Sequence, residues 1–289
     1  MLGLPDGITA CLFDMDGVVT KTAVVHAAAW KQMFDEFLRV WSARNGQAFV
    51  PFDPVRDYDQ YVDGKPRLDG TESFLESRGI KLPEGSPSDS PGTPTVQGLS
   101  NRKNELVLEV LKRDGVEVYP GSREYLAAVR KAGLKTAIVS SCANTEAVLK
   151  AGGVTDEFDV RIDAKVATER GLHGKPAPDT YLEAARMLGV DPEHAAVFED
   201  ALVGVAAGRA GKFGFVVGVD RVGQADELRE HGADVVVKDL SELLLPERAS
   251  MSVNASEGRR CHRRALAAGR RRRNWNDQGR AVRRGALEP

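Results

Sequence analysis

Short apolar runs alternate with longer amphipathic segments along most of this 289-residue chain. The apolar runs predict buried strands at residues 8–13, 134–139, 195–198, 213–219 and 234–237. Segments with helical periodicity predict helices at residues 121–132, 144–152, 178–188 and 201–210. Strands and helices that alternate in this way predict an α/β fold built on a doubly wound parallel sheet.

A long insertion follows the first predicted strand, because the second one begins only at Leu134. Within residues 22–45, apolar side chains recur at helical spacing: Val25, Ala29, Met33, Phe37 and Val40. A further helix is predicted at residues 101–114, and a loop rich in Ser, Pro and Gly at residues 84–98. We therefore expect residues 21–114 to form a helical cap inserted into the core.

The net charge of −2 conceals two segments of opposite sign. Residues 249–289 carry 11 Arg, no Lys and 3 acidic residues, giving +8, whereas residues 1–248 give −10. This basic tail has hardly any apolar periodicity, so we expect it to be disordered. It is either a tether for nucleic acid or another anionic surface, or an artefact such as out-of-frame reading of GC-rich DNA, and arginine without lysine favours the artefact. The core would then comprise residues 1–20 and 115–248.

The sequence contains no signal for membrane insertion or export. No apolar run reaches the ~18 residues that span a bilayer. The first residues, Met1 to Asp6, lack the basic and apolar regions of a secretory leader. Three cysteines, Cys11, Cys142 and Cys261, are too few and too scattered for a disulfide framework. We expect a cytoplasmic protein without membrane association, and a monomer is the favoured oligomeric state.

Two carboxylates, Asp14 and Asp16, follow the first predicted strand, where the chain turns at Gly17. In an open parallel sheet, ligands bind at this edge. Paired aspartates there can hold a hard cation through oxygen, and one of them can attack phosphorus as a nucleophile. The alternative is an ordinary capped turn, because Asp and Gly are common turn residues.

Three later motifs favour chemistry over a plain turn. Ser140 and Ser141 follow the strand at 134–139, Lys175 precedes a Pro-rich helix start, and Glu199-Asp200 close the strand at 195–198. Together with the Asp pair, these motifs resemble the haloacid dehalogenase superfamily of phosphoryl-transfer enzymes over roughly residues 8–245. The resemblance implies a Rossmann-like core.

The resemblance also implies a role for each motif residue. Asp14 would be the nucleophile that forms an aspartyl-phosphate, and Asp16 the general acid and base. Ser140 would bind the phosphoryl oxygens, and Lys175 would balance negative charge; its alternative is a solvated lysine. Such sites act by charge neutralisation and in-line positioning.

The same resemblance implies a magnesium site. Glu199 and Asp200 would orient Mg²⁺, with the Asp14 carboxylate and the Asp16 backbone carbonyl as further ligands. An all-oxygen site that also accepts a phosphate suits this ion.

Residues 14–22 (DMDGVVTKT), followed by His26 and Trp30-Lys31, narrow the resemblance to the β-phosphoglucomutase branch. In that branch, the threonine matched by Thr22 lies at the cap hinge. The histidine matched by His26 couples cap closure to the acid/base, although packing within a cap helix is the alternative for His26.

Further substrate contacts follow from this branch. Arg67, in the segment VDGKPR, would hold the phosphate that is not being transferred, because a guanidinium suits phosphate. Lys65, Lys103, Ser141 and Asn144 are the other candidate substrate contacts, and a solvated position is an open alternative for the two lysines. Where familiar mutases carry more polar and basic residues, this chain has Cys142 and Ala143.

We therefore expect a Mg²⁺-dependent β-phosphoglucomutase that interconverts β-D-glucose 1-phosphate and glucose 6-phosphate. The reaction would pass through an aspartyl-phosphate and β-D-glucose 1,6-bisphosphate, which would also act as the activator. A sugar-phosphate phosphatase, in which water accepts the phosphoryl group, is the main alternative. A nucleic-acid-binding protein that acts through the Arg-rich tail is the non-enzymatic alternative.

Overall fold

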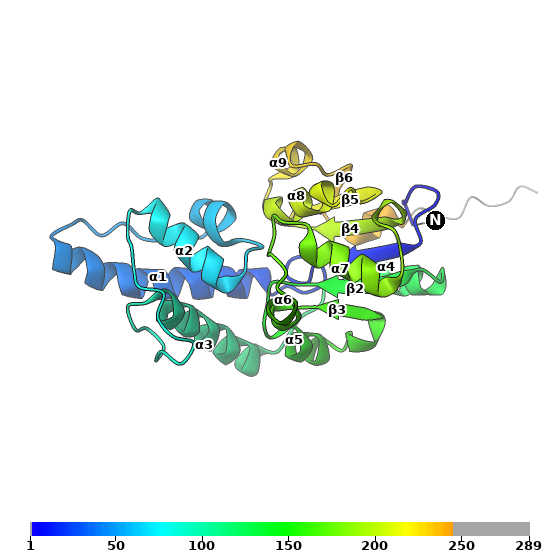
Figure 1. The fold of residues 1–289 in the computed structure, drawn as a ribbon. Coiled ribbons are helices and arrows are strands. Elements are labelled where there is room, and N and C mark those ends of the chain that lie inside the picture. The colour runs from blue at the N-terminus through cyan, green and yellow to red at the C-terminus, as the bar shows by residue number, and fades with distance from the viewer. Residues whose placement is uncertain (1, 245–289) are drawn as a thin grey trace, which may run out of the picture. The chain divides into compact units, whose positions relative to one another are not determined.

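The computed structural model describes residues 2–244, and the predictions made for residues 249–289 lie outside this range. A six-stranded parallel sheet has the strand order β3-β2-β1-β4-β5-β6 (Figure 1). Its strands are β1 (Ala10–Phe13), β2 (Lys135–Val139), β3 (Val160–Ile162), β4 (Ala195–Glu199), β5 (Phe215–Val219) and β6 (Val235–Val237). The strand order reverses between β1 and β4, and ligands of open α/β sheets bind at such a reversal.

Helices cover both faces of the sheet, as the sequence predicted. They are α4 (Pro120–Lys131), α5 (Thr145–Gly152), α6 (Ala164–Arg170), α7 (Asp179–Leu188), α8 (Leu202–Ala210) and α9 (Ala225–Glu230). In β1, Cys11 and Phe13 pack with α4 and α5, whereas Ala10 and Leu12 pack on the opposite face with α7 and α8. This alternation is the two-residue period of a strand that is buried on both faces.

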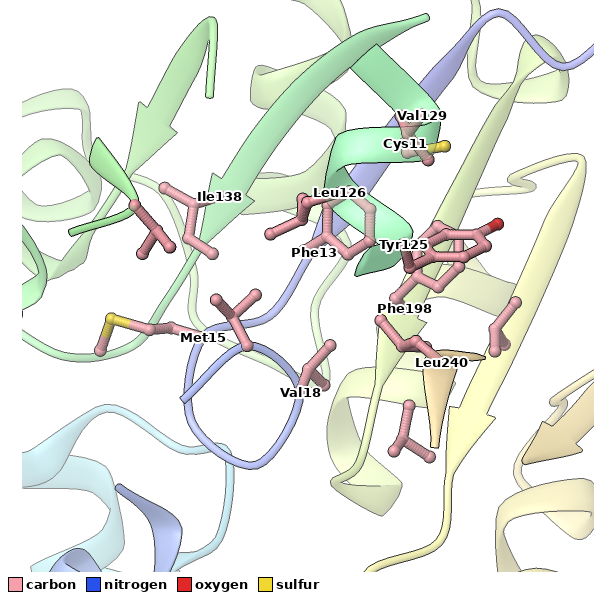
Figure 2. Close-up of a cluster of buried hydrophobic side chains, with 14 of the residues drawn as sticks. Cys11, Phe13, Met15, Val18, Tyr125, Leu126, Val129, Ile138, Phe198 and Leu240 are labelled. Carbon is pink, nitrogen blue, oxygen red and sulfur yellow. The ribbon is translucent and has the colours of Figure 1, made fainter. Parts of the chain in front are cut away.

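Three aromatic rings hold the two central strands together (Figure 2). Phe13 of β1 stacks on Phe198 of β4, with ring centroids 4.4 Å apart and an interplanar angle of 16°. Tyr125 of α4 packs against both rings, at centroid distances of 6.3 and 5.4 Å. Asp14 directly follows the first ring and Glu199 the second, so this cluster positions two of the candidate site carboxylates.

The inserted segment has a hydrophobic cluster of its own. Its helices are α1 (Ala23–Asn45), a π-helical turn (Tyr58–Val62), α2 (Arg67–Ser77) and α3 (Val96–Asp114). Helix α1 matches the prediction, but its buried face runs through Trp30, Phe34 and Leu38, whereas Val40 is 51% exposed. Phe34 packs on Phe74 of α2, with ring centroids 4.1 Å apart. A helix has 3.6 residues per turn, so Val40 has rotated away from the face that Phe34 defines.

Several short elements were not predicted from the sequence: α2, α6, α9, β3, the π-helical turn, and 3₁₀ turns at Thr155–Glu157, Pro192–His194 and Leu240–Leu243. Most of these elements contain too few periods for hydrophobic spacing to identify them, whereas α2 has 11 residues but only three large apolar side chains, Leu68, Phe74 and Leu75. Helix α3 begins earlier than predicted because Thr95 caps it, accepting a 2.9 Å hydrogen bond from the Gly98 N–H. Among the helices of residues 2–244, none combines the length and apolar character that a bilayer crossing requires.

Candidate functional site

Three carboxylates meet at the carboxyl ends of β1 and β4. Phe13 is in register with Phe198, and the Asp14 N–H donates to the Phe198 carbonyl at 2.9 Å. One oxygen each from Asp14, Glu199 and Asp200 lies within 4.8 Å of the others, and all three residues are buried. Parallel pairing of the two strands therefore brings together residues that are 185 positions apart in the sequence, because the residues that follow matched strand ends become neighbours.

Lys175 lies between two of these carboxylates. Its Nζ atom is 2.5 Å from Asp14 Oδ1 and 2.5 Å from Glu199 Oε1, and it also donates to the Val139 carbonyl at 3.3 Å. Burial works against the ammonium charge, but the two carboxylates outweigh it and hold the pKa of Lys175 above its usual value. Tyr181 adds a hydrogen bond from its hydroxyl to Glu199 Oε1, at 2.8 Å.

The remaining negative charge makes the cluster suitable for a divalent cation. Burial raises the pKa of Asp14, although Lys175 opposes that rise. Burial also raises the pKa of Asp200, with further contributions from Asp63 and Asp14. Three buried carboxylates facing one ammonium are a strained arrangement that a hard cation with oxygen ligands would relieve. The donors present therefore fit the magnesium ion that the sequence led us to expect.

Asp16 lies just before the inserted segment, within reach of two of its side chains. Thr22 Oγ1 donates a short hydrogen bond to Asp16 Oδ1, and Thr20 Oγ1 lies 2.6 Å from Thr22 Oγ1. His26 Nε2 is 3.6 Å from Asp16 Oδ1, and its other ring nitrogen is 2.8 Å from Lys103 Nζ. Thr22 and His26 are therefore positioned to orient the Asp16 carboxylate.

Two cations that line the site come from the inserted segment. Arg67 is the first residue of α2, and its Nε atom is buried without a hydrogen-bond partner. Lys65 Nζ donates to Ser73 Oγ at 2.9 Å. Between them and the π-helical turn, Gly64 adopts a φ of +67°, and a Cβ atom there would lie 2.7 Å from Val203 Cγ2. Only glycine allows the inserted segment to approach the core this closely.

The loop after β2 supplies the hydroxyl and amide groups. Ser140 Oγ accepts a hydrogen bond from the Cys142 N–H at 3.1 Å. Ser141 Oγ donates to the Gly64 carbonyl at 2.8 Å, and Asn144 Nδ2 donates to Asn104 Oδ1 at 2.9 Å. Ser141 and Asn144 thus bond across to the inserted segment, whereas Ser140 stabilises its own loop.

A cavity of about 1080 Å³ brings most of the predicted site residues together. Its lining includes Asp14, Asp16, His26, Lys65, Arg67, Lys103, Ser140, Ser141, Asn144, Lys175 and Asp200. Thr22 and Glu199 do not line the cavity but hold residues that do, through the contacts with Asp16 and Lys175 described above.

The structure brings four residues to this site that were not predicted from the sequence. Tyr58, Asp63 and Asn104 line the cavity, and Tyr181 bonds to Glu199 behind it. Burial raises the pKa of Asp63 to about 7, with Glu199 nearby adding to the rise. Asp63 and Asn104 stand beside predicted binding residues in the sequence, which was a usable signal. Tyr58 lies in the π-helical turn, which was not predicted. Tyr181 lies in the predicted helix α7, but nothing distinguished it from the other core residues of that helix.

Comparison with known proteins finds a family model and relatives that match the part of the chain carrying this site. The family model described as haloacid dehalogenase-like hydrolase matches residues 8–212. A protein of Mycobacterium bovis named beta-phosphoglucomutase is 56% identical over 247 residues, which cover 84% of this chain and 94% of that protein. A Bacillus subtilis protein of the same name is 31% identical, over 82% of this chain and 92% of its own.

A solved structure shows the same similarity in three dimensions. The crystal structure of a beta-phosphoglucomutase from Clostridium difficile superposes with a TM-score of 0.63 at 26% sequence identity. The match covers 82% of this chain and 93% of that one. The match therefore covers more residues than the sheet and the helices on its faces contain.

Proposed function

This chain belongs to the haloacid dehalogenase-like hydrolase family, and we propose that within it the chain is a Mg²⁺-dependent β-phosphoglucomutase. Its relatives make it a phosphoryl-transfer enzyme. One observation carries the narrower proposal: Arg67, a largely buried guanidinium with an unpartnered Nε, lines the same cavity as Asp14. A mutase must hold two phosphates of one sugar in a single cavity, and a guanidinium is well suited to hold the second.

The nucleophilic step uses Asp14. In our proposal one Asp14 oxygen forms a bond to phosphorus as the bond between phosphorus and the sugar oxygen breaks. Lys175 holds the attacking carboxylate in place, and Ser140 donates to the phosphoryl oxygens. Asp14, Glu199, Asp200 and the Asp16 backbone carbonyl would hold Mg²⁺. The bound ion would neutralise the charge of the phosphoryl group during transfer.

Asp16 moves the proton in both half-reactions. When phosphorylated Asp14 donates its phosphoryl group to a sugar hydroxyl, Asp16 removes the hydroxyl proton and the 1,6-bisphosphate forms. The bisphosphate then turns round, and its other phosphoryl group returns to Asp14 while Asp16 protonates the departing oxygen. The net result converts β-D-glucose 1-phosphate into glucose 6-phosphate. Such acid/base help contributes about 10²–10⁴-fold to the rate.

The inserted segment selects the sugar phosphate in this proposal. Residues 21–114 act as the cap, and residues 1–20 with 115–248 as the core. Cap closure would exclude water, which otherwise competes with the sugar hydroxyl for the phosphoryl group. The distal phosphate would lie against Arg67 and Lys103, with Lys65 close by, and the core would add Ser141 and Asn144. Thr22 and His26 would align Asp16 when the cap closes.

A sugar-phosphate phosphatase is the alternative, because water can replace the sugar hydroxyl as acceptor in the same site. One assay separates the two activities: purified protein receives β-D-glucose 1-phosphate, Mg²⁺ and a catalytic amount of the 1,6-bisphosphate. Glucose 6-phosphate and free phosphate are then measured together. Glucose 6-phosphate in large excess supports the mutase, and stoichiometric free phosphate overturns it.

A cytoplasmic location, a monomeric state and the absence of a nucleic-acid partner remain predictions from the sequence.

A further inference from the structure

The loop after β5 contacts both acidic loops of the site, although none of its residues lines the cavity. Arg221 Nε donates to the Gly17 carbonyl at 2.7 Å, and Gln224 Nε2 donates to the Asp200 carbonyl at 2.9 Å. Gly17 directly follows Asp16. The loop therefore holds the backbone of the two segments that carry the proposed acid/base and a proposed magnesium ligand.

This loop is itself well ordered by internal bonds. Asp220 Oδ1 accepts hydrogen bonds from the N–H groups of Gly223 at 2.6 Å and Gln224 at 2.9 Å. The Asp220 N–H donates to the Val237 carbonyl at 2.8 Å, which ties the loop to β6. Arg221, whose side chain is only 15% exposed, also donates through Nη1 to the Lys238 carbonyl at 2.6 Å. The backbone that follows β6 therefore holds the guanidinium in place.

The same guanidinium contacts the chain segment that leads from the inserted helices back to the core. Its central carbon lies 3.6 Å from the ring centroid of Tyr119, in a stacked cation–π contact. The two connecting segments are paired with each other: the Tyr119 N–H donates to the Val19 carbonyl at 3.1 Å, and the Lys21 N–H donates to the Glu117 carbonyl at 2.8 Å. Arg221 therefore contacts both connections at the point where they leave the core.

We propose that Arg221 is a positioning residue that fixes this pivot, so that Asp16 is aligned for proton transfer when the inserted segment closes. It acts through Gly17 and Tyr119 and does not touch the substrate. Gly17 leaves little freedom, because a Cβ atom there would lie 1.6 Å from Asp200 Oδ2. A misplacement of about 1 Å in such a site can reduce the rate about 10²-fold. This inference rests on the proposed phosphoryl transfer at Asp14.

The test compares Arg221→Met with a matched control, Arg209→Met. Arg209 also donates to a loop carbonyl, that of Gly232 at 2.6 Å, and pairs with Asp234 at 2.6 Å, but it does not line the cavity. For each variant, kcat and KM for β-D-glucose 1-phosphate are measured, together with the melting temperature. The number of active sites is counted from phosphate bound to Asp14 after reaction with an activated phosphate donor.

We expect Arg221→Met to lower kcat per active site at least about 10-fold, with KM changed less than about 3-fold. Arg209→Met should leave kcat within about 2-fold whatever it does to the melting temperature. Arg221→Lys, which keeps the charge but cannot stack as a plane, should give an intermediate loss and covers the case in which the Met variant does not fold. Tyr119→Leu should lower kcat in the same way, and the double variant should lose less than the product of the two single losses.

Two outcomes overturn the proposal. If Arg221→Met and Arg209→Met have equal kcat per active site, Arg221 only supports the fold. If the Tyr119 and Arg221 losses multiply, the two residues do not act through one pivot. A wild-type enzyme that transfers no phosphoryl group to any sugar phosphate is a different result, because it removes the proposed function itself.

Discussion

Lys103 Nζ lies 2.8 Å from His26 Nδ1, and this contact joins α3 to α1 inside the cavity. An ammonium can only donate, so Nδ1 accepts and the proton of neutral His26 resides on Nε2. Burial lowers the pKa of His26 to about 4, and the positive charge of Lys103 adds to this effect. The contact therefore fixes one tautomer and directs the remaining N–H of His26 towards Asp16, 3.6 Å away.

The charge of Lys103 should depend on pH within an accessible range. Burial lowers the pKa of Lys103 from 10.5 to about 8. We expect KM for the sugar phosphate to rise as pH passes about 8, by roughly 10-fold, because a charge-assisted hydrogen bond to phosphate is lost. Lys103→Arg remains charged at this pH and should not show the inflection. An inflection of the same size in that variant would assign it to another group.

The free energy of unfolding should rise with pH over the same range in which substrate binding weakens. Between pH 8 and 10.5 the unfolded chain binds a proton at Lys103 that the folded chain has released. The free energy of unfolding therefore rises with pH in this window as far as Lys103 is concerned. Chemical denaturation at pH 8 and pH 10 measures the change, and Lys103→Met removes it. A wild-type slope no steeper than that of Lys103→Met would contradict the buried, ionisable state of this lysine.

Removing the proposed metal ligand Asp200 should stabilise the metal-free protein. Burial and neighbouring carboxylates raise the pKa of Asp200, so Asp200→Asn relieves repulsion and should raise the melting temperature without Mg²⁺. Saturating Mg²⁺ should stabilise the wild type, by about 2.7 kcal/mol at 100 times Kd, and the variant much less. Asp226→Asn is the control, because that side chain is 90% exposed. Equal stabilisation by Mg²⁺ in all three proteins would place the ion elsewhere.

The central part of the site was predictable because strand ends are visible in the sequence. An apolar run identifies β1 and β4, and parallel strands align their carboxyl ends, so Asp14 and Glu199 were expected at the same edge of the sheet. That β1 pairs directly with β4 is a finding of the structure. Contacts between segments far apart in the sequence were not predictable. His26 and Lys103 were each expected near the substrate, but nothing in the sequence showed that they touch. Arg221, 204 residues from Gly17, gave no signal at all, because no periodicity links a loop to a distant carbonyl.

In the inserted segment, too, contacts between distant parts of the chain could not be predicted from the sequence. Hydrophobic spacing predicted the helix α1. It did not predict the buried face, because several apolar stripes share one helix, and Val40 proved to be exposed while Phe34 is fully buried. Packing against Phe74 of α2 decided between the stripes, and α2 was itself not predicted from the sequence.

Asp16→Asn should separate the two chemical roles of the aspartate pair. An amide cannot accept or donate the sugar hydroxyl proton, so mutase turnover should fall about 10²–10⁴-fold. Phosphorylation of Asp14 by an activated donor with a good leaving group needs no such proton and should survive better. Asp14→Asn serves as the control, because it should abolish both reactions. Equal losses in both reactions for Asp16→Asn would assign Asp16 a structural or metal-binding role.

Arg67→Ala tests the second phosphate site, on which the mutase proposal depends. The bisphosphate must be held at one end while the other faces Asp14, and Arg67 is a partly buried cation that lines the cavity and whose buried Nε has no hydrogen-bond partner. Mutase flux should therefore fall about 10-fold or more, since a charge-assisted hydrogen bond contributes roughly 1.5–3 kcal/mol. Hydrolysis of a small aryl phosphate, which has no second phosphate, should change little. Arg78→Ala is the matched control: this arginine follows the same helix but donates to the Pro51 carbonyl and pairs with Asp57. If Arg67→Ala and Arg78→Ala reduce the two reactions alike, Arg67 supports the helix and the phosphatase alternative gains support.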